Sequence, residues 1–373
     1  MPHSHTPLVV INATAYDGRP SGTRLRAACL AAALLEADAR VSVVSADGQS
    51  LAEAVRDQLG HDLPSSWSEC HLPVEQGRQV ARAIRLRRLL EPVVPPEAVF
   101  ITDYYPVLRS VPTIVTIHDL RYRRQRTLWS FLRSAALRYQ QRKIGSRNAA
   151  IFVDSGAIKR EVIQCYHFDP KRVTVSYCAV SRLFREASPP DFPGTHLLAV
   201  GLSDPRKKAD MLLAAYSLAN AEGSPLPLVI VGRINRDLQR LIDKCRKEVG
   251  DDMVRTTGIV SEEALVELYR RAAVLLHPSE YEGFGIPVLE ASAIGVPVIA
   301  APDPAVREIA PPLTRYLPAG DIFAWAREIN HASDQAELDP VRRRELRQWA
   351  RRFTWAHVAR QILDEVSHRT TMD

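Results

Sequence analysis

Short apolar runs alternate with helical patterns along this chain, and the series occurs twice. The first series begins with an apolar run at 8–12 and ends near 173–176, and the second begins at 196–200 and continues to 297–300. Strands that alternate with helices form a parallel sheet covered on both faces. Between the two series, at 188–194, proline and glycine cluster and the periodicity lapses. The sequence therefore predicts an α/β protein with two sheets.

The expected elements can be given range by range. The first series is expected to hold strands at 8–12, 41–45, 98–101, 112–117, 149–153 and 173–176, and helices at 21–37, 49–59, 76–91, 127–145 and 155–165. The second is expected to hold strands at 196–200, 226–231, 254–257, 273–276 and 297–300, and helices at 208–222, 235–248, 261–271 and 287–294. Helical patterns fill the remainder, including 355–368.

The length of the chain also indicates two domains. At 373 residues it exceeds the size at which a single hydrophobic core usually stops growing. We predict an N-terminal α/β domain over 1–187, a linker over 188–195 and a second α/β domain over 196–353. A helix over about 354–368 is expected to pack back on the first domain.

The composition is that of an ordinary globular protein, with 46% hydrophobic and 25% charged residues. No apolar stretch approaches the length that spans a bilayer, and the apolar run at 8–11 is too short for a signal peptide. Five cysteines are scattered without metal-binding spacing, which is typical of reduced thiols. We therefore expect a cytoplasmic protein.

A strand, a glycine loop and a helix follow one another at 274–294. Gly283 and Gly285 lie in the loop, and Pro287 takes the first-turn position that proline favours in helices. The N–H groups of Val288 and Leu289 are then expected among the first four of the helix, which lack an intrahelical partner. Such N–H groups, at the positive end of a helix and behind a loop of small residues, predict an anion site.

Two glutamates accompany this anion site. Glu282 lies on the loop and Glu290 lies one turn into the helix. A carboxylate and a phosphate repel each other because both are negatively charged. We therefore expect both glutamates to accept hydrogen bonds from hydroxyl groups. Phosphate and hydroxyls together indicate a nucleotide sugar. Taken by themselves, the two glutamates could simply be solvated side chains at a turn. The glycines, the proline and the strand that follows favour the ligand site.

The segment EGFGIPVLE, at 282–290, resembles the paired-glutamate signature of the retaining glycosyltransferases of family four. The resemblance implies a GT-B fold, in which two Rossmann-like domains face each other across a cleft. It further implies transfer of a hexosyl unit from a GDP-mannose or UDP-hexose type of donor to a hydroxyl acceptor. Retention, and no need for a metal or another cofactor, are implied as well; the chain has no Asp-x-Asp motif. A saccharide, a lipid-linked glycan and a small molecule remain open as acceptors.

Basic residues follow the strand expected at 196–200. Gly201 comes directly after this strand, and Arg206 and Lys207 follow where ligands gather in open α/β sheets, at the carboxyl ends of the strands. Arg206 can bind two phosphate oxygens at once, and Lys207 adds a compact charge. A solvated basic helix start is the alternative. The resemblance implies that both residues hold the donor diphosphate.

In the first half, the apolar run at 113–117 ends in His118 and Asp119. This resembles the family's strand-end histidine, which reaches the transferred sugar; a histidine that only caps the strand is the alternative. A histidine with a fixed polar neighbour can donate to a hydroxyl or to the reacting region. Gly22 and Thr23 match the family's small-residue loop over the diphosphate. The chain departs from the family at 175–180, where relatives usually carry Pro-Asn-Gly, so the acceptor side is left open.

The resemblance assigns two sets of site residues. The catalytic set is His118, Arg206, Lys207 and Glu282. The donor-binding set is Gly22, Thr23, Gly201, Arg206, Lys207, Arg233, Ile259, Glu282, Gly283, Phe284, Gly285, Ile286, Leu289 and Glu290. Arg233 and Ile259 are expected near the nucleobase, Glu290 at the ribose and Glu282 at the hydroxyls of the transferred sugar.

The net charge of +6 is shared unevenly between the halves. Residues 1–186 hold 26 basic and 17 acidic side chains, and nine of the basic ones lie at 121–147, where no acidic residue occurs. A basic stretch that also carries aromatic and aliphatic residues can lie on an anionic membrane. A solvated helix packed on the domain and a site for an anionic acceptor are the alternatives. Nucleic acid is not expected, because no recognisable binding module is present.

Two other functions remain open. One is a nucleotide-sugar epimerase of the same fold, whose pattern of acidic catalytic residues we do not find in the chain. The other is a non-catalytic sugar-nucleotide or glycan-binding protein, against which the presence of His118, Arg206, Lys207, Glu282 and Glu290 argues. Fold alone decides neither.

Overall fold

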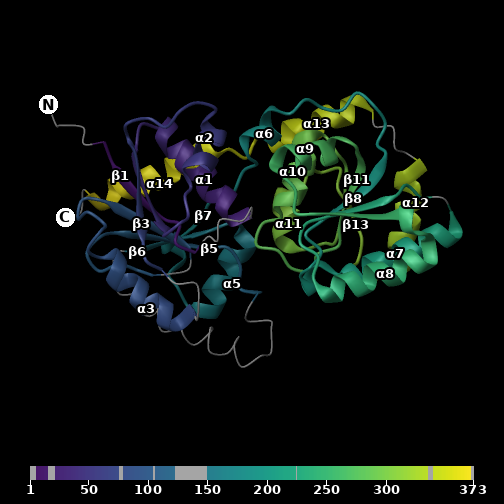
Figure 1. Ribbon diagram of the computed structural model, residues 1–373, viewed down its shortest axis with the longest axis horizontal. Helices are drawn as coiled ribbons and strands as arrows, with labels where there is room; N and C mark the ends of the chain where they lie inside the picture. The colour runs from purple at the N-terminus through teal and green to yellow at the C-terminus, as the bar shows by residue number, and fades with distance from the viewer. Residues whose placement is uncertain are drawn as a thin grey trace. The chain divides into compact units, whose positions relative to one another are not determined.

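The computed structural model describes residues 6–15, 22–74, 79–103, 106–121, 149–223, 225–334 and 339–370. The chain divides into two compact units, one formed by 1–182 with 354–373 and the other by 183–353. Each unit has its own parallel sheet, and Figure 1 labels the elements. Two parallel sheets with helices match the predicted α/β architecture.

The first unit has seven strands within the described residues. They are β1 (Leu8–Asn12), β2 (Arg40–Ala46), β3 (Trp67–Leu72), β4 (Val99–Asp103), β5 (Thr113–Ile117), β6 (Ala149–Val153) and β7 (Val173–Val175). Its helices are α1 (Gly22–Glu36), α2 (Ala52–Leu59), α3 (Gln79–Leu90), α5 (Gly156–Tyr166), the short η2 (Pro170–Arg172) and α14 (Trp355–Thr370). Helix α6 (Arg182–Glu186) begins at the division between the units.

The second unit has six strands within the described residues. They are β8 (His196–Val200), β9 (Leu228–Val231), β10 (Val254–Gly258), β11 (Ala272–His277), β12 (Val298–Ala300) and β13 (Arg315–Tyr316). Its longer helices are α7 (Ala209–Glu222), α8 (Arg236–Val249), α9 (Glu262–Arg270), α10 (Ile286–Ile294), α11 (Pro304–Ile309), α12 (Ile322–Asp334) and α13 (Pro340–Ala350). Two short 3₁₀ turns are η3 (Pro205–Lys207) and η4 (Asp251–Met253).

In the first unit the strand order is β3-β2-β1-β4-β5-β6-β7, all parallel. Strands β1, β5 and β6 are buried along their whole length, which is why they are largely apolar in the sequence, with Asn12, Thr113 and Thr116 as their polar residues. The chain order reverses between β1 and β4. Ligands of open α/β sheets bind at such a switch point, outside the carboxyl ends of the strands.

Strand β3 was not predicted from the sequence. It pairs with β2 alone, at the edge of the sheet, and Leu72 is the one buried residue of its WSECHL sequence, the other five being half-buried or exposed. An edge strand has one neighbour and a partly solvated face, so it needs no apolar run. The helix expected at 127–145 lies outside the described residues.

The C-terminal helix α14 packs on the first unit. It contacts α1, and the Trp355 indole N–H donates to the carbonyl of Val180 over 3.1 Å. The amide of Gln361 donates to the carbonyl of Val175, also over 3.1 Å. The last helix of the chain is thereby tied to a unit that begins at the other end of the sequence.

In the second unit the strand order is β10-β9-β8-β11-β12-β13, again parallel, with the reversal between β8 and β11. One face is covered by α7, which packs on α8 and α12. The core on this side includes Tyr216 and Trp325, both fully buried. The unit therefore has a hydrophobic core of its own.

The proline-rich segment predicted as a linker over 188–195 belongs to the second unit. Gly194 lies so close to β11 that an added Cβ would come within 2.3 Å of the Ala273 Cα. The N–H of Thr195 donates to the carbonyl of Arg271 over 2.8 Å. Pro190 is buried as well. The segment lacks a periodic pattern because it packs without regular secondary structure, so the unit begins earlier than the predicted 196.

No helix in the described part of the chain is long and apolar enough to cross a membrane.

Candidate active site

The candidate site lies in the second unit, where the loops after β8 and β11 meet at the switch point of the sheet. Gly201 follows β8, and its Cα lies 3.5 Å from where a Cβ on Gly232, after β9, would be. The two strand ends therefore approach without side chains between them. Gly201, as expected, stands at the carboxyl edge where a ligand of an open α/β sheet binds.

Arg206 lies on the 3₁₀ turn η3, directly after this edge. The Asp204 carboxylate accepts from the backbone N–H of Arg206 over 3.2 Å and from its Nε over 3.1 Å. Nη1 of Arg206 donates to the Tyr281 carbonyl over 2.8 Å and to Glu282 Oε2 over 3.2 Å. The guanidinium thus joins the loop after β8 to the loop after β11, a structural role that the sequence did not indicate.

Glu282 is the centre of the site. Its carboxylate is 7% exposed and pairs with the ammonium of Lys207, which is 8% exposed. His277, at the end of β11, places Nε2 3.3 Å from Glu282 Oε1. Two predicted residues far apart in the sequence therefore form a buried ion pair, and His277 is a partner that the sequence analysis missed. Its position at the last residue of a buried strand was the available signal.

The ionisation of this pair follows from its surroundings. Burial alone would raise the pKa of Glu282, but the charge of Lys207, the nearby His277 and the charge of Arg206 hold it well below its ordinary value. Burial lowers the pKa of His277, so the ring is neutral. The site therefore contains an ionised glutamate held by two permanent cations and a neutral histidine.

Asp303 holds the loop that carries Glu282 in place. This carboxylate accepts from the N–H of Glu282 over 3.3 Å and caps α11 by accepting from Ala305 and Val306 at 2.8 and 3.1 Å. Gly285, at the start of α10, has φ +106°, and an added Cβ would lie 3.2 Å from Val306 Cγ2. Only glycine adopts this conformation without strain. The loop geometry thus depends on α11 as well as on the site.

The expectation for the start of α10 was wrong by one residue. The helix begins at Ile286, and both Val288 and Leu289 donate their N–H groups to the Gly285 carbonyl, over 2.9 and 3.4 Å. These two N–H groups are therefore used within the helix. The groups that precede the first helical bond are those of Gly285 and Ile286, because Pro287 has no N–H.

Gly283, Phe284 and Leu289 belong to the same loop and helix, and all three are buried. The Phe284 ring lies edge-on to Phe353, with centroids 6.2 Å apart, and Leu289 is fully buried. The side chains of Phe284 and Leu289 therefore stabilise the loop. Any contact they make with a donor is through the backbone.

Glu290 is buried on α10 at 7% exposure, and its partner is Tyr269 of α9. The phenol donates to Glu290 Oε2 over 2.8 Å. Burial raises the pKa of Glu290 to about 7, against the hydrogen bond from Tyr269, and the charge of Lys207 acts on it as well. Lys207 therefore links the two glutamates electrostatically, and Tyr269 is a second residue that the sequence did not reveal.

The remaining predicted donor residues lie at exposed positions. Arg233, after β9, is exposed, and Ile259, after β10, is 53% exposed. Gly22 and Thr23 open α1 of the first unit and are exposed too. Exposure keeps all four accessible to a ligand.

In the first unit, His118 has partners that the sequence analysis missed. Its Nδ1 lies 2.7 Å from Asp154 Oδ2, and its Nε2 lies 3.1 Å from Asp103 Oδ1. Asp119, the expected polar neighbour, accepts from the N–H of Arg121 over 3.2 Å. Asp103 ends β4 and Asp154 follows β6, the two strands that flank β5. Polar residues at the ends of neighbouring strands were the available signal.

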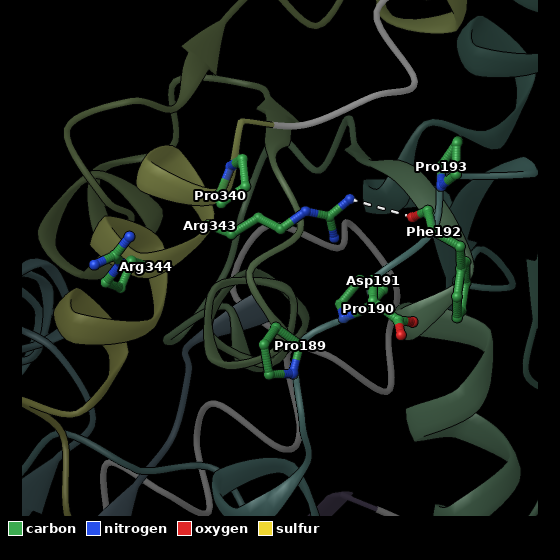
Figure 2. Close-up of a pocket in the computed structure, with 8 residues that line it drawn as sticks. All are labelled: Pro189, Pro190, Asp191, Phe192, Pro193, Pro340, Arg343 and Arg344. Carbon is green, nitrogen blue, oxygen red and sulfur yellow. Dashed lines mark hydrogen bonds between the residues drawn. The ribbon is translucent and has the colours of Figure 1, made fainter.

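A separate hollow of about 540 Å³ lies on the second unit, lined by Pro189, Pro190, Asp191, Phe192, Pro193, Pro340, Arg343 and Arg344. Figure 2 shows Arg343 reaching from α13 toward the Phe192 carbonyl, which it approaches to 3.5 Å. The hollow contains none of the predicted site residues. Helix α13, which lines the hollow, packs on α10, the helix that carries Glu290.

Comparisons with known proteins bear on the family of the chain. The family model described as Glycosyl transferases group 1 matches residues 183–352, and the model described as Glycosyltransferase Family 4 matches residues 20–182. O-antigen chain mannosyltransferase B of Escherichia coli is 25% identical over 278 residues, which cover 70% of this chain and 72% of that protein.

Solved structures are similar over nearly the whole chain. Sucrose-phosphate synthase from Thermosynechococcus elongatus has a TM-score of 0.78 at 16% identity, covering 98% of this chain and all of that one. Anabaena HepE, in complex with UDP and glucose, has a TM-score of 0.71 at 14% identity, covering 97% and 100%. At these identities the likeness shows the fold alone. Together with the two family models, it confirms the predicted family and fold: the chain belongs to the family 4 glycosyltransferases, which transfer a sugar from a nucleotide sugar and have the GT-B fold.

Proposed function

We propose that this glycosyltransferase moves a hexosyl unit with retention and without a metal, and that the loops after β8 and β11 hold its donor. One observation carries the proposal. The buried carboxylate of Glu282 is held between Lys207 and Arg206 at the switch point of the second sheet. Fixed cations, a fixed carboxylate and small residues at that edge fit a ligand with both phosphates and hydroxyls.

The cations account for departure of the leaving group. As the bond from the anomeric carbon to the diphosphate breaks, negative charge grows on the diphosphate. Positive groups stabilise that charge most when they are already in position. Lys207 has three N–H donors and Arg206 has five, so each can bind Glu282 and a phosphate oxygen together. No metal ion is required for this step.

The two glutamates take different parts of the donor. Glu282, ionised and on the loop, accepts hydrogen bonds from hydroxyls of the transferred sugar. Glu290, one turn into α10, accepts from the ribose hydroxyls. The backbone of 283–286 passes beside the sugar and the phosphates, and Arg233 and Ile259 lie beside the base. His118, in the first unit, contributes a positive charge.

UDP and GDP sugars are the donors that we propose. The support is the name of the Escherichia coli relative, a mannosyltransferase, and the UDP and glucose bound by the Anabaena neighbour. The acceptor is a hydroxyl of a glycan, a lipid-linked glycan or a small molecule. The stretch 121–147, nearly all of it outside the described residues, is proposed to contact an anionic acceptor or an anionic membrane from the cytoplasmic side.

Neighbouring lysines allow a matched test. Lys207 pairs with the buried Glu282, whereas Lys208 pairs with Glu280, which is 49% exposed, over 3.2 Å. Calorimetric titration with UDP, GDP and dTDP should find one that binds the wild-type chain. Lys207→Ala should weaken that binding by on the order of tenfold or more, and Lys208→Ala should change it little. Equal effects of the two substitutions, with both variants folded, would reject this donor site.

Transfer itself needs a second measurement. Release of UDP from UDP-glucose, or of GDP from GDP-mannose, reports turnover of the donor. The anomeric configuration of the product, read by NMR, reports retention. An inverted product would overturn the retaining assignment while leaving the donor site standing. Epimerisation is not favoured, because the named enzyme relative is a transferase.

A further inference from the structure

Four charged residues of the first unit form a buried group, which we call the histidine cluster: Arg26, Asp103, His118 and Asp154. The topology brings three of them together. Strand β5 lies between β4 and β6, and the pairing of Ile117 with Val153 places the next residues, His118 and Asp154, side by side. Asp103 ends the strand on the other side of β5. All three thus stand at the carboxyl edge of the sheet.

The distances show which carboxylate lies beside each nitrogen of the His118 ring. Asp154 Oδ2 lies 2.7 Å from His118 Nδ1, and Asp103 Oδ1 lies 3.1 Å from His118 Nε2. Arg26, on α1, reaches both carboxylates, at 3.5 Å for Asp154 and 3.7 Å for Asp103. The side chains are 13% exposed for His118 and 7% for Asp154. Each nitrogen of the imidazole therefore faces a carboxylate oxygen.

The balance of charge decides the ionisation of the ring. Burial disfavours the imidazolium, but the charges of Asp154 and Asp103 outweigh burial and the opposing charge of Arg26, and they raise the pKa of His118 to about 10. Cys178 also faces the cluster, accepting from Arg26 Nε over 3.4 Å, and burial raises its thiol pKa to about 12. At neutral pH two cations thus face two carboxylates.

We propose that Asp154 and Asp103 are positioning residues that keep His118 as an imidazolium in one fixed orientation, so that it enters glycosyl transfer as a permanent positive charge. The inference rests on the proposed function, in which His118 acts on the transferred sugar. It goes further by excluding His118 as the base that removes a proton from the acceptor, because a protonated ring has no lone pair to offer.

The position of Asp154 supports its leading role. It is the more buried of the two carboxylates and makes the shorter contact. It also precedes Ser155, whose hydroxyl caps α5 by accepting from the N–H of Ile158 over 3.2 Å. A strand end on one side and a helix cap on the other fix its backbone. Asp103, 20% exposed, is the outer partner.

The first test follows the ionisation of His118 directly in the wild-type chain. NMR of protein labelled at its histidines, titrated from pH 5 to pH 10, gives the protonation of each ring. The His118 signals are those missing in His118→Gln. We expect the ring to stay protonated above pH 9. Titration of His118 near its ordinary value of 6.5 would overturn the proposal, whatever the variants do.

The second test asks whether the fixed charge serves the reaction. Asp154→Asn keeps the shape of the side chain and removes its charge, and Asp119→Asn is the matched control from the neighbouring loop. If the pKa of His118 in Asp154→Asn returns to about 6.5, about one ring in a hundred is protonated at pH 8.5. At saturating donor, kcat relative to wild type should then fall on the order of a hundredfold between pH 6 and pH 8.5.

The substrates for that measurement are UDP-glucose and GDP-mannose, with nucleotide release as the readout. Asp119→Asn should follow the wild type at both pH values. A pH-independent ratio for a folded Asp154→Asn would overturn the positioning role. Urea unfolding of the full-length variant, compared with wild type, serves as the control for folding, because Asp154 lies in the first unit. The NMR titration needs no substrate, so failure of the proposed function, seen as no nucleotide release by wild type, is distinguishable from failure of this proposal.

Discussion

At alkaline pH, the substitution Glu290→Gln should raise the unfolding free energy of the second unit and lower its affinity for nucleotide. Glu290 is 7% exposed on α10, and burial raises its pKa to about 7 from an ordinary 4.5. The native state therefore binds this proton more tightly than the unfolded chain does. The stability that the proton provides is fully present below pH 4.5 and is lost as the pH rises through 7.

The magnitude follows from the difference between the two pKa values. At about 1.4 kcal/mol for each pH unit, the wild type should lose about 3 kcal/mol of unfolding free energy across this window through Glu290 alone. Glutamine has nearly the same shape, still accepts from the Tyr269 phenol and does not titrate. Relative to wild type, Glu290→Gln should therefore gain about 2 to 3 kcal/mol between pH 5 and pH 8.5.

Urea unfolding at several pH values, followed by tryptophan fluorescence, measures this difference. Trp325 and Trp349 report on the second unit. Glu263→Gln is the matched control, an exposed glutamate on α9, and should follow the wild type. An identical pH dependence in Glu290→Gln and wild type would refute the reasoning. By calorimetry, wild-type affinity for UDP or GDP should rise through pH 7, because the ionised carboxylate is the better acceptor for ribose, and the variant should show no such rise.

Three further outcomes are expected. The Tyr269 phenol donates to Glu290 over 2.8 Å and thereby lowers the pKa of Glu290. Tyr269→Phe removes this hydrogen bond, so the midpoint of the pH-dependent nucleotide affinity should move above 7; an unmoved midpoint in calorimetry contradicts this. Gly285→Ala should cost about 1 to 2 kcal/mol of unfolding free energy in urea titration, because φ is +106° and the new Cβ meets Val306; a variant as stable as wild type argues against a strained loop start. EDTA should leave nucleotide release from UDP-glucose or GDP-mannose unchanged, and activity lost to EDTA but restored by Mg²⁺ would show a metal requirement.

Much of the fold followed from the sequence because the buried strands are largely apolar runs. Strands β1, β5 and β6, buried at every residue, coincide with the predicted ranges to within a residue. Strand β3 did not follow, because an edge position lets Ser68, Glu69 and His71 stand in a strand without an apolar pattern. The sequence predicted a linker at 188–195 for a related reason. Proline and glycine indicate that a segment lacks regular secondary structure. They do not indicate whether that segment packs on a domain or links two domains.

The donor loop was predicted in part. The spacing of Glu282 and Glu290 and the basic pair at 206–207 identified the right loops, since each lies within one continuous segment. The partners of those residues come from other strands and helices. Tyr269 binds Glu290 from α9, and Asp303 fixes Glu282 from the start of α11. Such contacts depend on helix packing and on the order of strands, which local patterns do not contain.

The histidine cluster marks the limit most clearly. The sequence places Asp119 beside His118, and adjacency in the chain suggested it as the polar neighbour. Asp119 instead lies in the loop after β5, where it accepts from the N–H of Arg121. The residues that reach His118 are at the ends of the two flanking strands, 15 positions before it and 36 positions after it. Strand order and register bring them together, so only the folded sheet reveals that His118 is held as a cation.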